Sequence, residues 1–274
     1  TGQITLTDHG VLVGSGASAI DVLSVGTTGQ LLVGVSGADP AFGASASADF
    51  TFTSATAGAT RTLTVSNTDN TNVASIALVQ TTTGGASAGD PFHTYTVTGA
   101  TSWSQGIDNS ASDAYKISAS TALGTTDVMI ATTAGEITYP LQPAFSANLS
   151  ADANDVTGDG TIYTVIYNTE VFDQNSDYNN ASGIFTAPVT GRYFLTGQSS
   201  TAPSTSGAIN GAMQFVSSNR TYNGQSLPTT VLGANNWVYL SITNLADMDA
   251  ADTTNCAVAF YGGTKNADIQ GGGM

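Results

Sequence analysis

Charged residues are scarce in this chain of 274 residues. Only 9% of the residues are charged, five of them are Lys or Arg, and the formal net charge is -15. Such a charge repels phosphate backbones, so we expect no nucleic-acid partner. Glu, Lys and Arg, which favour helices, are few, whereas Thr, Val and Ile recur in short alternating runs. The composition therefore predicts an all-β protein whose strands are joined by Gly, Asn and Asp turns.

Cysteine and long apolar runs are also lacking. Cys256 is the single cysteine, which excludes an intrachain disulfide framework and indicates a small buried strand residue. No apolar run approaches the roughly 20 residues that span a bilayer, so we expect no membrane insertion. The chain begins with Thr1, so we expect a processed or partial chain. Acidic excess with little Lys suits an extracellular location.

Catalytic signatures are missing as well. His9 and His93 are the two histidines, and both precede the C-terminal third of the chain. Neither "GQSST" nor "GVSGA" has the Gly-x-Ser-x-Gly spacing of a nucleophile elbow, so a Ser-His-Asp arrangement is not indicated. Glu136 and Glu170 lie in separate strand-like runs, which does not favour a glycosidase carboxylate pair. We predict no catalytic residues and no enzymatic activity.

The first 43 residues contain an imperfect repeat. "LVGSGAS" begins at Leu12 and "LVGVSGA" begins at Leu32. Units this short cannot bury their own apolar faces, so they must stack on neighbours or on other chains. Residues 1–43 are interpreted as Gly-rich stalk repeats, either in a trimeric fibrous stalk or in a pair of loop-rich hairpins.

Longer strand-like runs follow in residues 44–140, which we interpret as a β-rich shaft module. "RTLTVS" and "TYTVT" alternate apolar residues with threonines and therefore predict half-buried strands. "SNTDNTN" and "GIDNSASD" carry turn chemistry between the strands. Pro140 and Pro143 bracket the predicted boundary.

Residues 141–274 predict a sandwich or barrel. Strand-like runs such as "SGIFTAPV", "GRYFLTGQ" and "NCAVAFYGG" are regularly spaced and separated by polar turns. The fold class predicted for the whole chain is therefore all-β, with a fibrous β stalk and a shaft module followed by a β-sandwich head.

The residues of this head carry a family resemblance. "PAFSANLS" followed by "IYTVIYNTEVFDQNSDYNNASGIFTAPVTGRYFLTG" resembles the jelly-roll head of the complement first-component recognition subunit, within the complement/TNF superfamily. The matching positions are Ala144, Phe145, Ser146, Asn168, Tyr178, Gly183, Phe185, Pro188, Gly191 and Tyr193.

This resemblance implies a jelly roll that trimerises about a threefold axis. Phe145, Phe185 and Tyr193 are predicted structural core residues, Pro188 fixes φ, and Gly191 permits the reversal between strands. The chain departs from the family pattern at "IQGGGM". We therefore expect a head that lacks its last strand and leaves an unpaired sheet edge.

The upstream region resembles repetitive segments of bacteriophage tail fibres and bacterial surface fibres. "GTTGQLLVGVSGADPAFG" and "WSQGIDNSASDAYKISASTALGTTDVMIATTAGEITYP" carry this second resemblance. It implies a receptor-binding fibre on a virion tail or a cell-surface appendage, with the head at the distal tip.

Acidic loops of the head suggest calcium as a possible cofactor. Oxygen ligands on flexible loops suit this ion, although neither loop fits the EF-hand pattern. The candidate metal ligands are Asp152, Asp155, Asp159, Asp247, Asp249 and Asp252. Solvated turn carboxylates are the alternative interpretation.

Aromatic residues beside amides suggest a second kind of site, for a sugar. "NRTYNG" and "GANNW" place Tyr222 beside Asn223 and Trp237 close to Asn235. Sugars stack on such rings, and amides supply hydrogen bonds. Strand Tyr and Trp residues also serve as core, so both interpretations stay open.

Together these patterns predict an extracellular homotrimeric fibre protein. It would mediate adhesion through its C-terminal head, with a cell-surface glycan or protein as receptor. The alternative is a structural subunit of a secreted filament or matrix, with strand complementation between subunits. A glycan depolymerase is the least favoured function.

Overall fold

The computed structural model describes residues 11–14, 21–27, 30–35, 38–43, 89–201, 210–228 and 238–272. The chain separates into two compact units, Thr1–Leu78 and Val79–Met274, and each is described by itself. The described residues are nearly all β-structure or turns, and a single 3-10 turn, η1 (Asn109–Ala111), is their only helical element. The predicted all-β fold class is confirmed.

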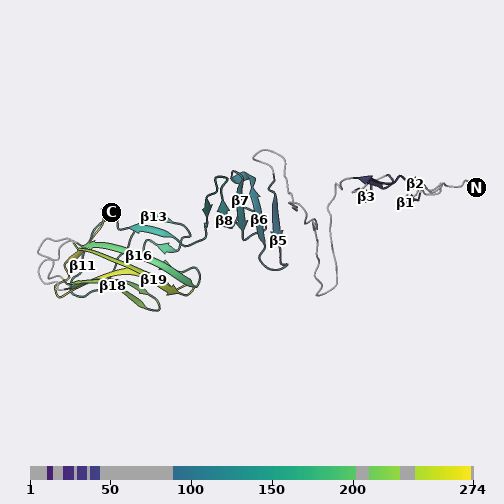
Figure 1. The fold of residues 1–274 in the computed structure, drawn as a ribbon. Coiled ribbons are helices and arrows are strands. Elements are labelled where there is room, and N and C mark those ends of the chain that lie inside the picture. The colour runs from purple at the N-terminus through teal and green to yellow at the C-terminus, as the bar shows by residue number, and fades with distance from the viewer. Residues whose placement is uncertain are drawn as a thin grey trace, which may run out of the picture. The chain divides into compact units, whose positions relative to one another are not determined.

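The Thr1–Leu78 unit holds two short antiparallel ribbons (Figure 1). Their pairs are β1 (Val11–Val13) with β2 (Asp21–Leu23) and β3 (Leu31–Val33) with β4 (Ala41–Gly43). Leu12, Leu31 and Leu32 remain about half exposed, because a two-stranded ribbon has too few strands to cover its own apolar residues. The strand-like runs expected at 50–80 lie outside the described residues.

A five-stranded antiparallel sheet follows in sequential order. Its strands are β5 (Phe92–Tyr95), β6 (Trp103–Asp108), β7 (Ala114–Ser118), β8 (Asp127–Ala131) and β9 (Ile137–Thr138). The run "TYTVT" is only partly a strand, because β5 ends at Tyr95 and a turn joins the Ala100 N–H to the Val97 carbonyl at 2.9 Å. Tyr95 and Val97 are exposed, so the expected half-buried strand is wrong at this place.

The head is a sandwich of two main sheets (Figure 1). The first has the order β11-β21-β16-β19, and the second has the order β14-β15-β20-β17-β18 with β12 also paired to β20. Beside them β10 (Phe145–Asn148) pairs with β13 (Thr169–Asp173). The other bounds are β11 (Ala153–Thr157), β12 (Tyr163–Thr164), β14 (Tyr178–Asn179), β15 (Ile184–Thr186), β16 (Gly191–Thr201), β17 (Asn210–Ser217), β18 (Thr221–Pro228), β19 (Val238–Met248), β20 (Thr253–Tyr261) and β21 (Ala267–Gln270).

The core lies between these sheets. Strand alternation directs Leu240 and Ile242 of β19 inward, where they join Met213 of β17 and Val258 of β20 in one buried cluster. Phe185 is buried in the same cluster, and Phe145 and Tyr193 pack against it. The rings of Phe145 and Phe185 stack, with centroids 5.4 Å apart.

The last strand that the structure describes is β21. It lies between β11 and β16 and pairs with both of them. It is short, however, and reaches β16 only at Ser200 and Thr201. The remaining length of β16 therefore meets no strand on that side among the described residues. The expected absence of the family's closing strand stays a prediction.

Candidate functional site

The outer face of the β16 and β19 pair carries exposed large apolar side chains among polar ones. Phe194 is 73% exposed and lies directly opposite Leu245, which is 59% exposed. Tyr239, also 59% exposed, lies farther along the same face. The alternation that buries Leu195 must turn its neighbour Phe194 outward. Large apolar residues grouped on one exposed sheet face mark an interaction surface, and we call this group the β16–β19 face.

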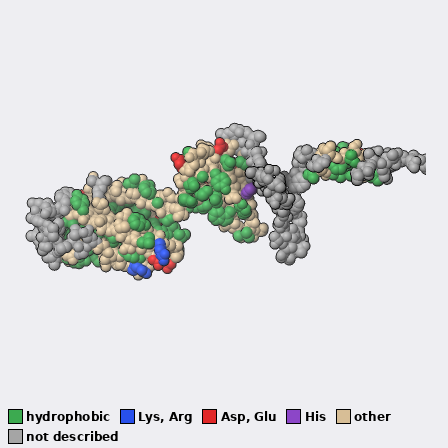
Figure 2. Space-filling view, in the orientation of Figure 1, with side chains coloured by type: hydrophobic (Ala, Val, Ile, Leu, Met, Phe, Trp, Pro, Cys, Tyr) green, Lys and Arg blue, Asp and Glu red, His purple; other side chains and the backbone are tan. Residues whose placement is uncertain are grey.

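Charge is nearly absent from this face. Between the Phe194–Leu245 pair and Tyr239 lie uncharged residues, including Thr196 and Thr243, whose hydroxyls are 3.3 Å apart. Arg192 lies opposite Asp247 at one end. Figure 2 likewise shows broad areas of hydrophobic side chains and only isolated charged ones on the face that it displays.

A cavity of about 620 Å³ lies in the head between β10 and β16. We call it the β16 slot. None of its lining residues is charged. Representative lining residues are Phe145, Asn148, Leu195, Gln198, Phe215 and Cys256.

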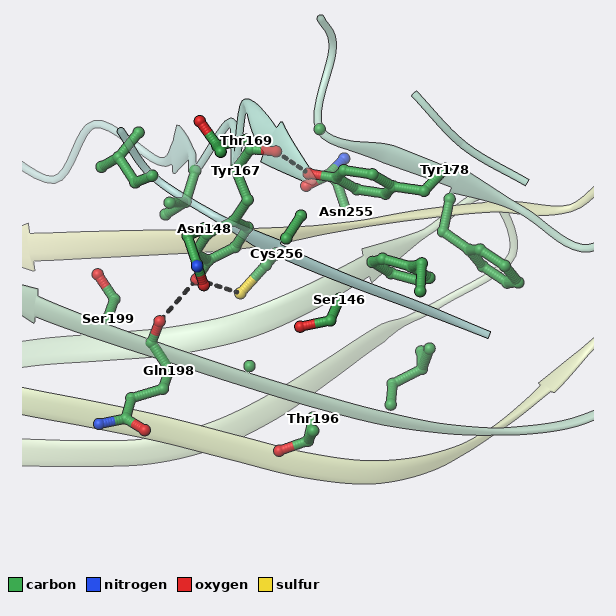
Figure 3. Close-up of a pocket in the computed structure, with 18 of the residues that line it drawn as sticks. Ser146, Asn148, Tyr167, Thr169, Tyr178, Thr196, Gln198, Ser199, Asn255 and Cys256 are labelled. Carbon is green, nitrogen blue, oxygen red and sulfur yellow. Dashed lines mark hydrogen bonds between the residues drawn. The ribbon is translucent and has the colours of Figure 1, made fainter. Parts of the chain in front are cut away.

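Tyr167 reaches across one part of the slot (Figure 3). Its hydroxyl donates to the Gln198 carbonyl at 2.8 Å and lies 3.8 Å from Cys256 Sγ. Tyr178 in turn donates to the Tyr167 carbonyl at 3.0 Å. Burial raises the pKa of Tyr167 strongly, that of Tyr178 to about 12 and that of the Cys256 thiol to about 12. All three groups are therefore neutral at pH 7, and the thiol is a poor nucleophile.

Buried polar atoms also face this slot. Ser199 Oγ, Thr254 Oγ1 and Asn255 Oδ1 are buried with no hydrogen-bond partner among the described residues. All three residues line the cavity. Buried polar groups in folded proteins normally have partners, so these atoms identify the slot as a place where an occupant can add hydrogen bonds.

The predicted acidic loops are held by turn hydrogen bonds. Asp152 Oδ1 accepts from the Gly271 N–H at 2.8 Å, and Asp159 Oδ1 accepts from the Thr161 N–H at 3.0 Å. Asp155, at φ 52°, donates its N–H to Asp268. No group of three His, Cys, Asp or Glu residues suited to a metal occurs within the described ranges. Calcium binding by these residues stays a prediction.

The second acidic loop is organised around Asp252. Its Oδ2 accepts from the Asp249 N–H at 2.9 Å and from Asn219 Nδ2 at 2.8 Å, while Ser218 Oγ donates to Oδ1 at 2.6 Å. The hydrogen bonds from the Ser218 hydroxyl and from the Asp249 N–H hold the pKa of Asp252 below its usual value. Asp247 is separate, since its N–H donates to the Tyr222 hydroxyl at 3.2 Å.

The predicted sugar-contact residues are only partly described. Tyr222 lies in β18, packs partly against the core, and has the Arg220 guanidinium 5.9 Å from its ring centroid. Asn223 beside it is exposed. Asn235 and Trp237 lie outside the described residues. A sugar site at these positions stays a prediction.

The corner "TAPVTG" differs in detail from expectation. Pro188 is exposed in the turn, so it belongs to the turn and not to the packed core. Gly191 begins β16 without a left-handed φ, and an added Cβ would meet only the Tyr193 ring at 3.9 Å. The glycine that needs its special backbone is Gly183, at φ 71°, where a Cβ would come within 3.0 Å of the Val165 carbonyl oxygen.

Replacing Gly183 with alanine is therefore expected to destabilise the head by about 1–3 kcal/mol, because a left-handed alanine is strained and crowds Val165. Gly191→Ala is the matched control, with an expected change below about 0.5 kcal/mol. Urea unfolding followed by circular dichroism measures both. Equal losses for the two variants would contradict this assignment of roles.

The five-stranded sheet presents an aromatic face that the sequence analysis missed. Tyr95 lies opposite Trp103, and Ile107 lies opposite Tyr115, all on one exposed face. Gln105 lies between the tyrosines, donating to the Tyr95 hydroxyl at 2.7 Å and accepting from the Tyr115 hydroxyl at 3.5 Å. The alternation of these residues is visible in the sequence, but the sequence does not show which face of the sheet is covered.

The opposite face of that sheet holds a buried ion cluster. Lys116 Nζ lies 2.8 Å from Asp108 Oδ2 and 3.0 Å from Asp127 Oδ2. The side chains are 9%, 6% and 11% exposed respectively. Hydrogen bonds from Lys116 and Ser110 lower the pKa of Asp108. Burial opposes the charge of Lys116, but the hydrogen bonds that its ammonium donates to both aspartates raise its pKa. Burial likewise opposes the charge of Asp127, but hydrogen bonds from Ser118 and Lys116 lower its pKa.

Comparison with known proteins supports the fold of the head. Residues 144–242 match the sequence model of the C1q domain. No curated protein matches the chain. Among solved structures it is similar to the globular domain of zebrafish complement 1qA protein, with 17% identity and a TM-score of 0.33, covering 47% of this chain and 92% of that one. Murine APRIL has 8% identity and a TM-score of 0.31, with coverages of 47% and 98%.

The C-terminal region is therefore similar to the C1q domain over residues 144–242. The predicted resemblance of the head is confirmed, whereas the tail-fibre resemblance of the upstream region stays a prediction. Domains of this kind are typically non-enzymatic binding modules that form trimers and are usually extracellular. No helix within the described ranges is long and apolar enough to cross a membrane.

Proposed function

We propose that this chain is an extracellular homotrimeric fibre protein, on a virion tail or a cell surface, that binds a receptor through its C1q-domain head. The observation that carries the proposal is the β16–β19 face, where Phe194, Leu245 and Tyr239 are exposed in the single chain. Contact with two further copies would remove these side chains from water. The C1q match agrees with this assembly, because C1q domains typically homotrimerise.

The five-stranded sheet supports the same assembly. Its aromatic face, with Trp103, Tyr95 and Tyr115 exposed, lies on residues preceding the head in the chain. Once three heads are joined, the three copies of this sheet are held at high effective concentration. Further contacts between copies then need little intrinsic affinity. We infer that residues 89–138 form part of the shaft module predicted at residues 44–140.

Adhesion by such a fibre depends on its valency. A single head contact can be weak, yet three heads acting together raise the apparent affinity by about 100-fold to 10,000-fold. The receptor is proposed to be a cell-surface glycan or protein that contacts loops around the scaffold and the predicted sugar-contact residues Tyr222 and Trp237.

Binding of the fluorescently labelled protein to a glycan array tests this function. We expect retention that rises steeply with glycan density and falls at least about 100-fold in a monomeric variant. The double substitution Tyr222→Ala and Trp237→Ala should abolish retention without changing the trimer mass. Retention that is equal for monomer and trimer would contradict multivalent adhesion.

A further inference from the structure

The segment that joins β9 to β10 is a turn bounded by prolines. We call this segment, residues 139–144, the joint. The Gln142 N–H donates to the Tyr139 carbonyl at 3.1 Å, which closes a β-turn with Pro140 at its second position. Pro140 and Pro143 also fix their own φ and restrict the residue before each of them. The sequence of the joint therefore favours one turn but leaves several of its dihedral angles free.

One residue of the head, Gln174, holds this turn through its side chain and its backbone. Gln174 Nε2 donates to the Tyr139 carbonyl at 2.7 Å and to the Gln142 carbonyl at 2.8 Å. The Gln174 backbone N–H donates to the Ala144 carbonyl at 2.9 Å. A primary amide carries two N–H donors, so this side chain directs both of them to the joint.

The position of Gln174 is itself fixed by its neighbours. Asp173, the last residue of β13, accepts the Asp177 N–H at 3.2 Å and the Tyr178 N–H at 3.0 Å. Asp173 also lies opposite Phe145 in the pairing of β10 with β13. The rings of Phe145 and Tyr178 stack, with centroids 4.4 Å apart. The hydrogen bonds of Gln174 therefore connect the joint to the packed part of the head.

Other forces hold the joint only weakly. Its two prolines have no N–H and contribute no donor. Tyr139 is 53% exposed and Leu141 is 40% exposed, so the burial of these side chains in the single chain is incomplete. Without the amide of Gln174, the turn would rest on the bond from the Gln142 N–H to the Tyr139 carbonyl. A single exposed hydrogen bond stabilises a turn only slightly.

We propose that Gln174 is a clamp that stiffens the joint, so that the five-stranded sheet and the head move as one body. Its amide fixes both ends of the turn, and its backbone N–H fixes the residue that leads into β10. When the amide is lost, the dihedral angles of the joint become free, and the sheet moves independently of the head. The clamp lies within one chain, so it goes beyond the proposed function and does not depend on the trimer.

Hydrogen exchange of residues 139–144, followed by mass spectrometry, tests the clamp. Exchange in Gln174→Ala should accelerate about tenfold, because two hydrogen bonds to the joint are lost. Gln142→Ala is the matched control, since it removes an exposed amide but keeps the carbonyl that Gln174 contacts. After correction for the intrinsic rate, its exchange should stay within about twofold of the wild type. Equal acceleration in both variants, or none in Gln174→Ala, overturns the proposal.

Gln174→Glu separates the role of the donor from that of the side-chain shape. A carboxylate at this place only accepts, so at pH 7 the joint should exchange at least as fast as in Gln174→Ala. Below about pH 4 the carboxyl group is protonated and regains one donor. Exchange in Gln174→Glu should then become about threefold slower than in Gln174→Ala at the same pH. Equal rates for the two variants at both pH values overturn the role of Gln174 as a donor.

The distance between the sheet and the head tests whether they move as one body. Nitroxide labels are attached to Thr133→Cys, before β9, and to Thr186→Cys, in β15, both exposed. The single native cysteine is removed by Cys256→Ser, and labelled chains are diluted with unlabelled ones. Double electron–electron resonance should give a narrow distance distribution when Gln174 is present and a broad one in Gln174→Ala. Equal widths overturn the proposal. The mass of the assembly tests the trimer separately, so the two proposals can fail independently.

Discussion

Replacing Lys116 with methionine is expected to destabilise the five-stranded sheet by about 3 kcal/mol at pH 7. The substitution leaves Asp108 and Asp127, each almost covered, without the ammonium that both of them contact. Breaking a buried pair by removing one partner costs about 3–5 kcal/mol. We expect a loss of stability at the lower end of this range, because the cluster lies beneath loops of the sheet and not deep in a core.

The pH dependence gives this prediction a distinctive sign. In the wild type the pKa values of both aspartates are lowered, so their stabilisation is present above about pH 4 and is lost as the pH falls through the folded pKa values. The raised pKa of Lys116 adds stability below about pH 10.4 that is lost as the pH rises through its folded pKa. In Lys116→Met the two carboxylates repel each other, so acidification from pH 7 towards pH 4.5 should stabilise the variant.

Hydrogen exchange of β6 to β8, followed by mass spectrometry, measures this effect locally. Exchange in the variant at pH 7 should accelerate about 100-fold, after correction for the intrinsic rate. Lys265→Met is the matched control, because Lys265 is exposed. An unchanged exchange rate in Lys116→Met would mean that the cluster does not hold the sheet together.

Replacing Phe194 with aspartate is expected to dissociate the trimer. Phe194 is the most exposed large apolar side chain of the β16–β19 face, and a carboxylate there must be desolvated against apolar neighbours. We expect the dissociation constant to rise at least about 100-fold. The fold of the single head should stay intact, since the side chain is directed away from the core.

The control is Ile162→Asp, which places the same charge at another exposed apolar residue. Ile162 is 56% exposed and precedes β12, which pairs with β20 in the other sheet. Size-exclusion chromatography with light scattering compares the two variants. Dissociation in both, or in neither, would show that the β16–β19 face is not the contact between copies.

Much of the head could be predicted from local sequence. The alternation in "GRYFLTGQ" and the motif around Phe185 specify strands and one buried ring, because period-two burial is a local property. The glycine that permits a chain reversal was predicted at Gly191, whereas the glycine with the left-handed backbone is Gly183. Sequence shows where glycines occur but not their φ. The pairing of β21 with β16 at Ser200 and Thr201 could not be located from the sequence, because it is a contact between distant parts of the chain.

The five-stranded sheet was harder to predict for a different reason. Alternation in "WSQGIDN" and "AYKISAS" separates Trp103 and Tyr115 from Ser104 and Lys116, but it does not say which set is covered. In the single chain the loops cover the serine and lysine side, where Asp108 and Asp127 neutralise Lys116. The proposed trimer would cover the apolar side as well.

Sedimentation equilibrium of this 274-residue chain at several concentrations tests the central claim most directly. The account predicts a single species with three times the chain mass of 27.6 kDa, unchanged across the concentration range. A monomer at all concentrations would contradict it, and so would a mass that grows without limit, which is the behaviour of the filament alternative.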